Sequence, residues 1–273
     1  MICDVCPRRC NIEEGKRGFC KARGNRGDRN VSLSYGKLTS IALDPIEKKP
    51  LARFHPGSRV LSVGSFGCNM DCPFCQNYSI ASASEDDVRT RCLSPGELAG
   101  MAEELREEGN IGLAFTYNEP MIGYEYVRDA SMEAKARGMK NVVVTNGCVL
   151  PHILDEVLPS VDAFNIDLKS FSEETYRMLG GDLSTVQNFI KKAAERSHVE
   201  ITTLIVPGMN DREEEINALS GWLRSVDRSI PLHITRFFPR RKMSDRKPTD
   251  VDLLRRLCAA AEKNLDDVLI GNV

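Results

Sequence analysis

The chain has 273 residues, of which 41% are hydrophobic and 28% are charged, and its formal net charge is −2. This length suits one large α/β domain or two ordinary domains. The near-neutral charge gives no electrostatic evidence of nucleic-acid binding. The sequence has neither an apolar run long enough for a transmembrane helix nor an N-terminus that resembles a signal peptide. We therefore expect a soluble, cytoplasmic protein that binds neither nucleic acid nor a membrane.

Seven of the ten cysteines fall in two groups with metal-like spacing. The first group has the pattern C-x2-C-x3-C-x9-C and consists of Cys3, Cys6, Cys10 and Cys20. Four thiols complete the shell of either a zinc ion or a [4Fe–4S] cluster. The residue types leave open whether this metal only stabilises a small lobe or also transfers electrons. We expect the isolated Cys92, Cys148 and Cys258 to be small buried hydrophobic residues.

Short β-strand signals follow at residues 31–35 and 38–43. The prolines at positions 45, 50 and 56 exclude a helix between them and favour an extended loop. Lys48 and Lys49 in this loop are interpreted as a solvated surface pair. We place an N-terminal Cys-rich and short-strand lobe at residues 1–57 and a core domain at residues 58–273.

The second group is Cys68, Cys72 and Cys75, spaced C-x3-C-x2-C directly after an apolar run at residues 60–64. Thiolates are soft ligands for iron–sulfur clusters, zinc or Cu(I). Three cysteines on a [4Fe–4S] cluster leave one iron free to bind a small molecule. A zinc site is the alternative, with Cys92 or a histidine as the fourth ligand.

From residue 94 onward, apolar strands alternate with amphipathic helices. The pattern predicts strands at 60–63, 111–115, 141–145, 161–168, 199–206, 232–235 and 267–270. Helices are expected near 95–108, 121–137, 151–158, 172–196, 212–226 and 250–264. Apolar strands that are each followed by a helix indicate an α/β fold with a parallel sheet, here a partial or full TIM-like barrel of about six βα units.

Polar residues follow the expected strands at the ends where a barrel carries its reactive groups. Their chemistry suits a zwitterionic ligand that bears a nucleoside. Glu119 could bind an amino group, Lys169 or Arg236 a carboxylate, and Asn146 or Asp167 ribose hydroxyls. The simpler alternatives are ordinary turns and an Asp167–Lys169 ion pair at the barrel rim.

The second cysteine group, with Phe74 before its last cysteine and Asn77 after it, resembles the cluster loop of the radical S-adenosylmethionine (SAM) superfamily, including pyruvate formate-lyase activating enzymes. The whole chain resembles most closely the AmmeMemoRadiSam system radical SAM enzyme family. The resemblance is carried by the N-terminal cysteines and by segments 44–51, 116–120, 144–147 and 233–239.

This resemblance implies a partial (β/α)6 radical SAM barrel with a [4Fe–4S] cluster on Cys68, Cys72 and Cys75. The reduced cluster would cleave SAM to a 5′-deoxyadenosyl radical, which abstracts hydrogen from an unidentified substrate that could be a protein. The residues it implies for SAM binding are Asn77, Glu119, Thr145, Asn146, Asp167, Lys169 and Arg236. The implied partners are an electron donor such as ferredoxin or flavodoxin, and Memo-family and Ammecr-family proteins.

The chain departs from its relatives in three places. Segment 116–120 replaces a Gly-Gly-Glu motif, so only Glu119 corresponds directly. The Gly-Pro-Gly-x-Arg stretch of glycyl-radical activases is absent, and so is a C-terminal Cys-Pro-x-Cys tail. Two alternatives to the leading interpretation stay open: an activase for a glycyl-radical enzyme, and a non-catalytic binding module held together by metal.

Overall fold

The computed structural model describes residues 1–273 and is built around one eight-stranded sheet with the order β12-β11-β10-β9-β8-β7-β5-β4. Seven of these strands are parallel, as the sequence predicts from their continuous apolar character. The expected boundaries are confirmed to within two residues: β5 (Arg59–Gly64), β7 (Asn110–Phe115), β8 (Lys140–Thr145), β9 (Ala163–Asp167), β10 (His198–Ile205), β11 (Leu232–Arg236) and β12 (Val268–Gly271).

The edge strand β4 (Ser40–Pro45) runs antiparallel to β5, with Ser40 opposite Gly64 and Pro45 opposite Arg59. The expected division after residue 57 therefore passes through the main sheet, since β4 lies before it and β5 after it. Residues 38–43, expected as one strand, are split between β4 and the short β3 (Lys37–Leu38), which pairs with β6 (Arg91–Cys92). Before them, β1 (Arg23–Arg26) and β2 (Arg29–Ser32) form a separate hairpin.

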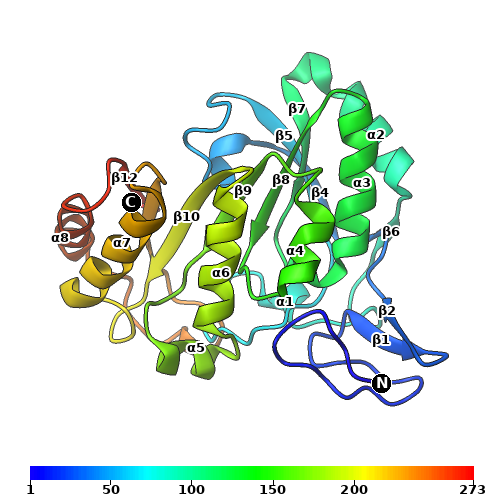
Figure 1. Ribbon diagram of the computed structural model, residues 1–273, viewed down its shortest axis with the longest axis horizontal. Helices are drawn as coiled ribbons and strands as arrows, with labels where there is room; N and C mark the ends of the chain where they lie inside the picture. Colours follow the sequence, from blue (N-terminus) through cyan, green and yellow to red (C-terminus); the bar gives the residue numbers. More distant parts are fainter.

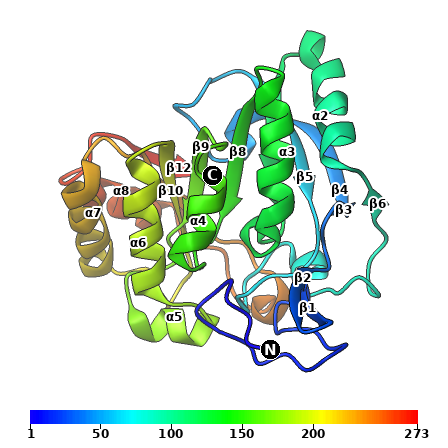
Figure 2. The ribbon, with the colours of Figure 1, turned by 45° about the vertical axis from the view of Figure 1, so that its right-hand side comes forward.

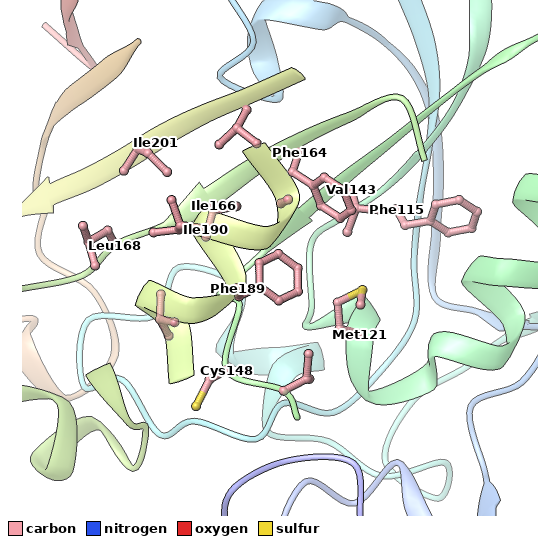
Figure 3. Close-up of a cluster of buried hydrophobic side chains, with 14 of the residues drawn as sticks. Phe115, Met121, Val143, Cys148, Phe164, Ile166, Leu168, Phe189, Ile190 and Ile201 are labelled. Carbon is pink, nitrogen blue, oxygen red and sulfur yellow. The ribbon is translucent and has the colours of Figure 1, made fainter. Parts of the chain in front are cut away.

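Figures 1 and 2 show the long helices packed on one side of the sheet. They are α2 (Pro95–Glu104), α3 (Tyr124–Ala136), α6 (Leu183–Ala194), α7 (Glu213–Asp227) and α8 (Val251–Ala261), together with the shorter α4 (Pro151–Val157). The short helices α1 (Tyr78–Ala81) and α5 (Glu173–Leu179) lie at one end of the molecule. The hydrophobic core lies between these layers (Figure 3), where the Phe189 ring of α6 meets the Phe164 ring of β9 edge to face at 5.6 Å. No helix is both long and apolar enough to cross a membrane.

The expected helix over residues 172–196 is wrong, because the structure has two helices, α5 and α6, in its place. Gly180 ends α5 with φ +77°, a left-handed conformation that glycine adopts without strain. Asp182 then caps α6 by accepting a hydrogen bond from the Thr185 N–H at 2.7 Å. The helical periodicity on both sides of this junction is continuous enough to hide the break.

Two further expectations are wrong. Lys49 is not a solvated surface residue: it is 2% exposed, and its ammonium donates to the Asp44 carboxylate at 2.7 Å and lies 4.7 Å from the centre of the Tyr117 ring. Its neighbour Lys48 is exposed, as expected. Cys92 is not buried but lies on the exposed β6, whereas Cys148 and Cys258 are buried as predicted. In both errors, tertiary packing decided the burial of a residue whose type alone favoured the other outcome.

Glu200 of β10 ties the proline-rich loop to the sheet. Its buried carboxylate accepts hydrogen bonds from the rings of His198 (2.9 Å) and His233 (2.6 Å) and from the backbone N–H groups of Ala52 (2.9 Å) and Arg53 (2.7 Å). Burial raises the pKa of Glu200, but these donors outweigh burial and hold the pKa at about 2.

We expect Glu200→Gln to lower the free energy of unfolding near pH 7 by about 2–4 kcal/mol, since several hydrogen bonds to a buried charge are weakened. The native pKa of about 2 lies below the ordinary 4.5. The stabilisation is therefore present above pH 4.5 and is lost as the pH falls through about 2. Denaturant unfolding at several pH values checks this: the difference from wild type should shrink on acidification. The exposed Glu214→Gln is the control, and an equal effect of both variants would contradict the prediction.

Candidate functional site

The polar side chains predicted at the strand ends lie at one edge of the sheet, the edge that is formed by the C-terminal ends of its parallel strands. The cysteine loop, residues 65–77, leaves β5 at this edge and leads into α1. Figures 1 and 2 show α1, α5 and the N-terminal segment together at this end of the molecule. The candidate site therefore combines the predicted strand-end residues with the N-terminal cysteines nearby.

The three thiols of the loop share one neighbour, Lys169. Burial raises the pKa of each thiol, that of Cys72 to about 11, and the nearby ammonium of Lys169 acts in the opposite direction on Cys68, Cys72 and Cys75. The side chains do not form a ligand shell of three or more His, Cys, Asp or Glu groups. Ligation by these thiols therefore stays a prediction, which rests on their spacing and on this shared neighbour.

Backbone donors prepare two of the thiols for negative charge. The Met70 N–H donates to Cys68 Sγ at 3.4 Å, and the Asn77 N–H lowers the pKa of Cys75 against the effect of burial. Each donor lies two residues after its cysteine. These N–H groups and the nearby Lys169 ammonium partly offset the burial that raises the thiol pKa values, and they ease the release of a proton that accompanies metal binding. The donor set therefore fits a cluster held by three cysteines.

A basic segment that the sequence analysis missed holds the outer side of the loop. The Arg241 guanidinium donates to the Cys72 carbonyl at 2.7 Å and also bonds the Asp71 carboxylate. Lys242 donates to Asp71 through its ammonium at 2.9 Å and to the Pro73 carbonyl through its N–H at 3.0 Å. The basic run at residues 240–242 was the available signal, but nothing in the sequence showed that it meets this loop.

Glu119 lies beneath the loop and is 3% exposed. Its carboxylate accepts hydrogen bonds from Thr145 Oγ1 (2.6 Å) and from the N–H groups of Asn146 (2.7 Å) and Met121 (3.0 Å). Burial raises its pKa to about 7 in spite of these donors, and its charge in turn raises the pKa of Cys68. Thr145 thus orients Glu119, and the carboxylate is a buried negative group beside the cysteine loop.

Asn146 is fully engaged within the protein. Its amide NH2 donates to Asn69 Oδ1 at 2.9 Å and lies 3.7 Å from Cys68 Sγ, while its Oδ1 accepts from the Cys148 N–H at 2.8 Å. Asn69 is buried beside Cys68 and was not singled out from the sequence. Both asparagines therefore position the cysteine loop.

Asp167 and Lys169 form the ion pair that the sequence left open, with Lys169 Nζ 2.9 Å from Asp167 Oδ2. Burial alone would lower the pKa of Lys169, but the Asp167 charge outweighs it and raises the pKa. The same ammonium acts on all three loop thiols. The pair is thus part of the site's electrostatics as well as a rim contact.

The last two predicted residues lie at the borders of the site. Asn77 donates to the Tyr117 carbonyl at 2.8 Å, which joins the end of the cysteine loop to the loop after β7. Arg236 ends β11, donates to the Thr249 carbonyl at 2.8 Å and stacks 5.1 Å from the Phe238 ring centre. Its side chain is directed toward the segment before α8.

The chain is similar to several known proteins. It is 39% identical over 276 aligned residues to uncharacterized protein MJ0808 of Methanocaldococcus jannaschii, covering 99% of this chain and 81% of that protein. It is 25% identical to pyruvate formate-lyase 1-activating enzyme of Escherichia coli K12, covering 63% and 70%. Its fold resembles Streptococcus suis SuiB bound to S-adenosylmethionine, with a TM-score of 0.60 at 13% identity over 76% of this chain and 48% of that one.

The Radical SAM superfamily model matches residues 62–219, which is more than half of the chain and includes the cysteine loop and the ends of β5 to β10. This match excludes the non-catalytic module that the sequence analysis left open. It agrees with the mostly parallel α/β sheet and with the cysteine loop at the sheet edge, where Cys72 is buried and Cys68 and Cys75 are partly buried. The chain belongs to the radical SAM superfamily and is an S-adenosylmethionine-dependent iron–sulfur enzyme.

Proposed function

We propose that this protein is a radical SAM enzyme of the AmmeMemoRadiSam type, which acts on a substrate still to be identified. The segments that carry this resemblance contact one another in the fold: Asp44 accepts from Lys49 at 2.7 Å and from the Tyr117 hydroxyl at 2.6 Å. Residues 44–51 and 116–120 are far apart in the sequence, so this contact supports their joint role in one site.

The observation that carries the proposal is the grouping of the three loop thiols, one buried and two partly buried, within the electrostatic influence of Lys169 and beside the buried Glu119. Cys68, Cys72 and Cys75 would hold a [4Fe–4S] cluster with one iron open to SAM. When bound and reduced, this cluster would supply the electron for reductive cleavage of SAM to methionine and a 5′-deoxyadenosyl radical, which would take hydrogen from the substrate.

The surrounding residues would bind the two charged groups of SAM with side chains of opposite charge. Glu119 supplies a carboxylate for the ammonium of SAM, and Thr145 fixes its orientation. Lys169 supplies the positive charge for the SAM carboxylate, while Asp167 and Asn77 face the rim, where ribose hydroxyls are accepted. Arg236 is a second, more peripheral cation. Asn146 acts through Asn69 and Cys68.

The fold as a whole has a role in the proposed reaction. The sheet is a partial (β/α)6 TIM-like barrel whose loops cover the radical chemistry and exclude water. Residues 1–57 supply an N-terminal Cys-rich lobe together with the edge strand β4 of the main sheet, and the protein works in the cytoplasm. Radical SAM enzymes need a reductant, here ferredoxin or flavodoxin, and Memo-family and Ammecr-family proteins are the proposed partners.

A glycyl-radical activase is the second candidate. The similarity to pyruvate formate-lyase 1-activating enzyme, over 63% of this chain, favours it. The missing Gly-Pro-Gly-x-Arg stretch argues against it. A glycyl-radical signal on a partner enzyme after incubation with this protein, SAM and reductant would select this candidate over the first.

The central test is anaerobic reconstitution with iron and sulfide, followed by reductant and SAM. We expect 5′-deoxyadenosine and methionine in equal amounts, because both come from one cleaved bond. The cluster is checked separately by its electron paramagnetic resonance (EPR) spectrum after reduction. A fully loaded, reduced cluster that binds SAM but yields no 5′-deoxyadenosine, with or without partner proteins, would refute the proposed reaction.

A further inference from the structure

Cationic side chains from distant parts of the chain meet on the outer side of the cysteine loop. Lys21 donates to the Ser82 carbonyl at 2.6 Å, and Arg241 contacts the hydroxyl of the same serine at 3.1 Å. Lys242 donates to the Asp71 carboxylate at 2.9 Å. Asp71 is the one acidic residue in the loop, so cations outnumber carboxylates there. This surface is basic although the whole chain has a formal net charge of −2.

A hollow of about 310 Å³ opens beside this basic surface, between the N-terminal segment and the end of α5. The two are adjacent because the Asp71 N–H donates to the last residue of α5 at 2.9 Å. Arg8 and Arg177 line the hollow together with Asn69, which directly follows Cys68 in the chain. A partner side chain in this hollow would therefore lie one residue away from a proposed cluster ligand.

Several of these cations have donors left for an anionic partner. The exposed ones are Arg8, Lys21, Arg177 and Lys242. Lys21 uses one of the three N–H donors of its ammonium, and Arg177 donates to a carbonyl of its own helix at 3.4 Å. Exposed cations with free donors can form charge-assisted hydrogen bonds with carboxylates. The surface can therefore bind an acidic protein.

The hollow is separate from the proposed SAM site. None of the residues proposed to bind SAM lines it. An electron must reach the cluster while SAM occupies the open iron, so the reductant needs an approach that SAM does not block. A protein bound at the hollow would leave the SAM site free and would still lie next to the cysteine loop.

We propose that Arg8, Lys21, Arg177 and Lys242, with the hollow between them, form the docking surface for an acidic electron-transfer protein. Opposite charges steer such a partner and fix its orientation. Of the anionic macromolecules that a basic surface can bind, a redox protein is the one that supplies the required electron. The carrier loses one electron and the cluster gains it, with no bond made or broken. This inference rests on the proposed function of the cysteine loop.

The test uses the full chain, reconstituted anaerobically with iron and sulfide, and an acidic flavodoxin as the probe. The Kd for oxidised flavodoxin is measured by titration, and electron transfer from reduced flavodoxin by stopped-flow absorbance. We expect Lys21→Glu and Arg177→Glu each to raise the Kd by about 10-fold at about 0.05 M salt and to slow electron transfer. The difference should shrink at about 0.5 M salt, where charges are screened. Lys21→Gln and Arg177→Gln should have smaller effects.

Arg224→Glu is the matched control, because Arg224 is also an exposed helical arginine but lies in the last turn of α7. It should bind flavodoxin as wild type does. Dithionite, which needs no docking, should reduce the cluster equally in all variants, as measured by EPR. Failure of dithionite to reduce the wild-type cluster would refute the proposed function and the docking role with it. With a reducible cluster, equal Kd values in wild type and both charge-reversal variants, or no binding to wild type at low salt, would overturn the docking surface alone.

Discussion

Cys72→Ala is expected to abolish 5′-deoxyadenosine formation and to remove about four iron atoms per chain relative to wild type. Cys72 is the middle cysteine of the loop, and its thiol is near both Lys169 and Cys75. Two remaining thiols cannot hold the cluster against loss of iron. Iron analysis, the EPR spectrum and product quantification after anaerobic reconstitution check this expectation.

Cys258→Ala is the matched control. Cys258 and Cys72 are both 8% exposed, so both substitutions remove a sulfur of the same burial. Each should cost about 1 kcal/mol of folding free energy through lost packing. Only Cys72→Ala should lose iron and product. Retention of iron and activity in Cys72→Ala would show that these thiols do not hold the cluster.

The second prediction concerns Glu119→Gln, which keeps the shape of the side chain but removes its charge. We expect the Kd for SAM to rise by about 10- to 100-fold, equivalent to the roughly 1.5–3 kcal/mol of a hydrogen bond to a charged group. Binding to the reconstituted protein should be measured by titration. Iron content should stay at the wild-type level, because Glu119 is not one of the proposed ligands.

The pH dependence gives Glu119 a distinctive signature. Burial raises its pKa to about 7, so acidification protonates the carboxylate and removes the charge that an ammonium requires. Wild-type affinity for SAM should therefore weaken as the pH falls through about 7, and Glu119→Gln should lack this step. The exposed Glu108→Gln should behave as wild type. Equal affinity in wild type and Glu119→Gln at high pH would exclude the proposed contact.

The parallel sheet could be predicted because its strands are mostly apolar. A strand covered on both faces favours a continuous apolar run, and runs such as 111–115 and 142–144 carry this signal locally. The break at Gly180 had a local signal that the prediction missed, because two glycines followed by Asp182 are typical of one helix ending and another beginning. Gly180 lies where Arg8 donates to its carbonyl at 3.0 Å and where Asp71 donates its N–H to Leu179, contacts that come from distant parts of the chain.

The residues of the candidate site likewise differ in whether a local sequence pattern could identify them. The spacing of Cys68, Cys72 and Cys75 identified the cysteine loop, because a short loop brings its own side chains together whatever surrounds it. Neither the support from Arg241 nor the link through Asn69 has a spacing signal, since both depend on segments far apart in the sequence that meet only in the fold.

The sequence by itself determined the metal-like cysteine spacings, the order of strands and helices, and the polar residues at the strand ends, because each of these depends on residues close together in the chain. Only the tertiary structure decided that Lys49 is buried against Asp44, that Asn146 holds Asn69, and that the N-terminal cysteines lie against the loop of Cys68. Burial and long-range contacts depend on which surfaces the fold brings together. A side chain's own type therefore constrains them only weakly.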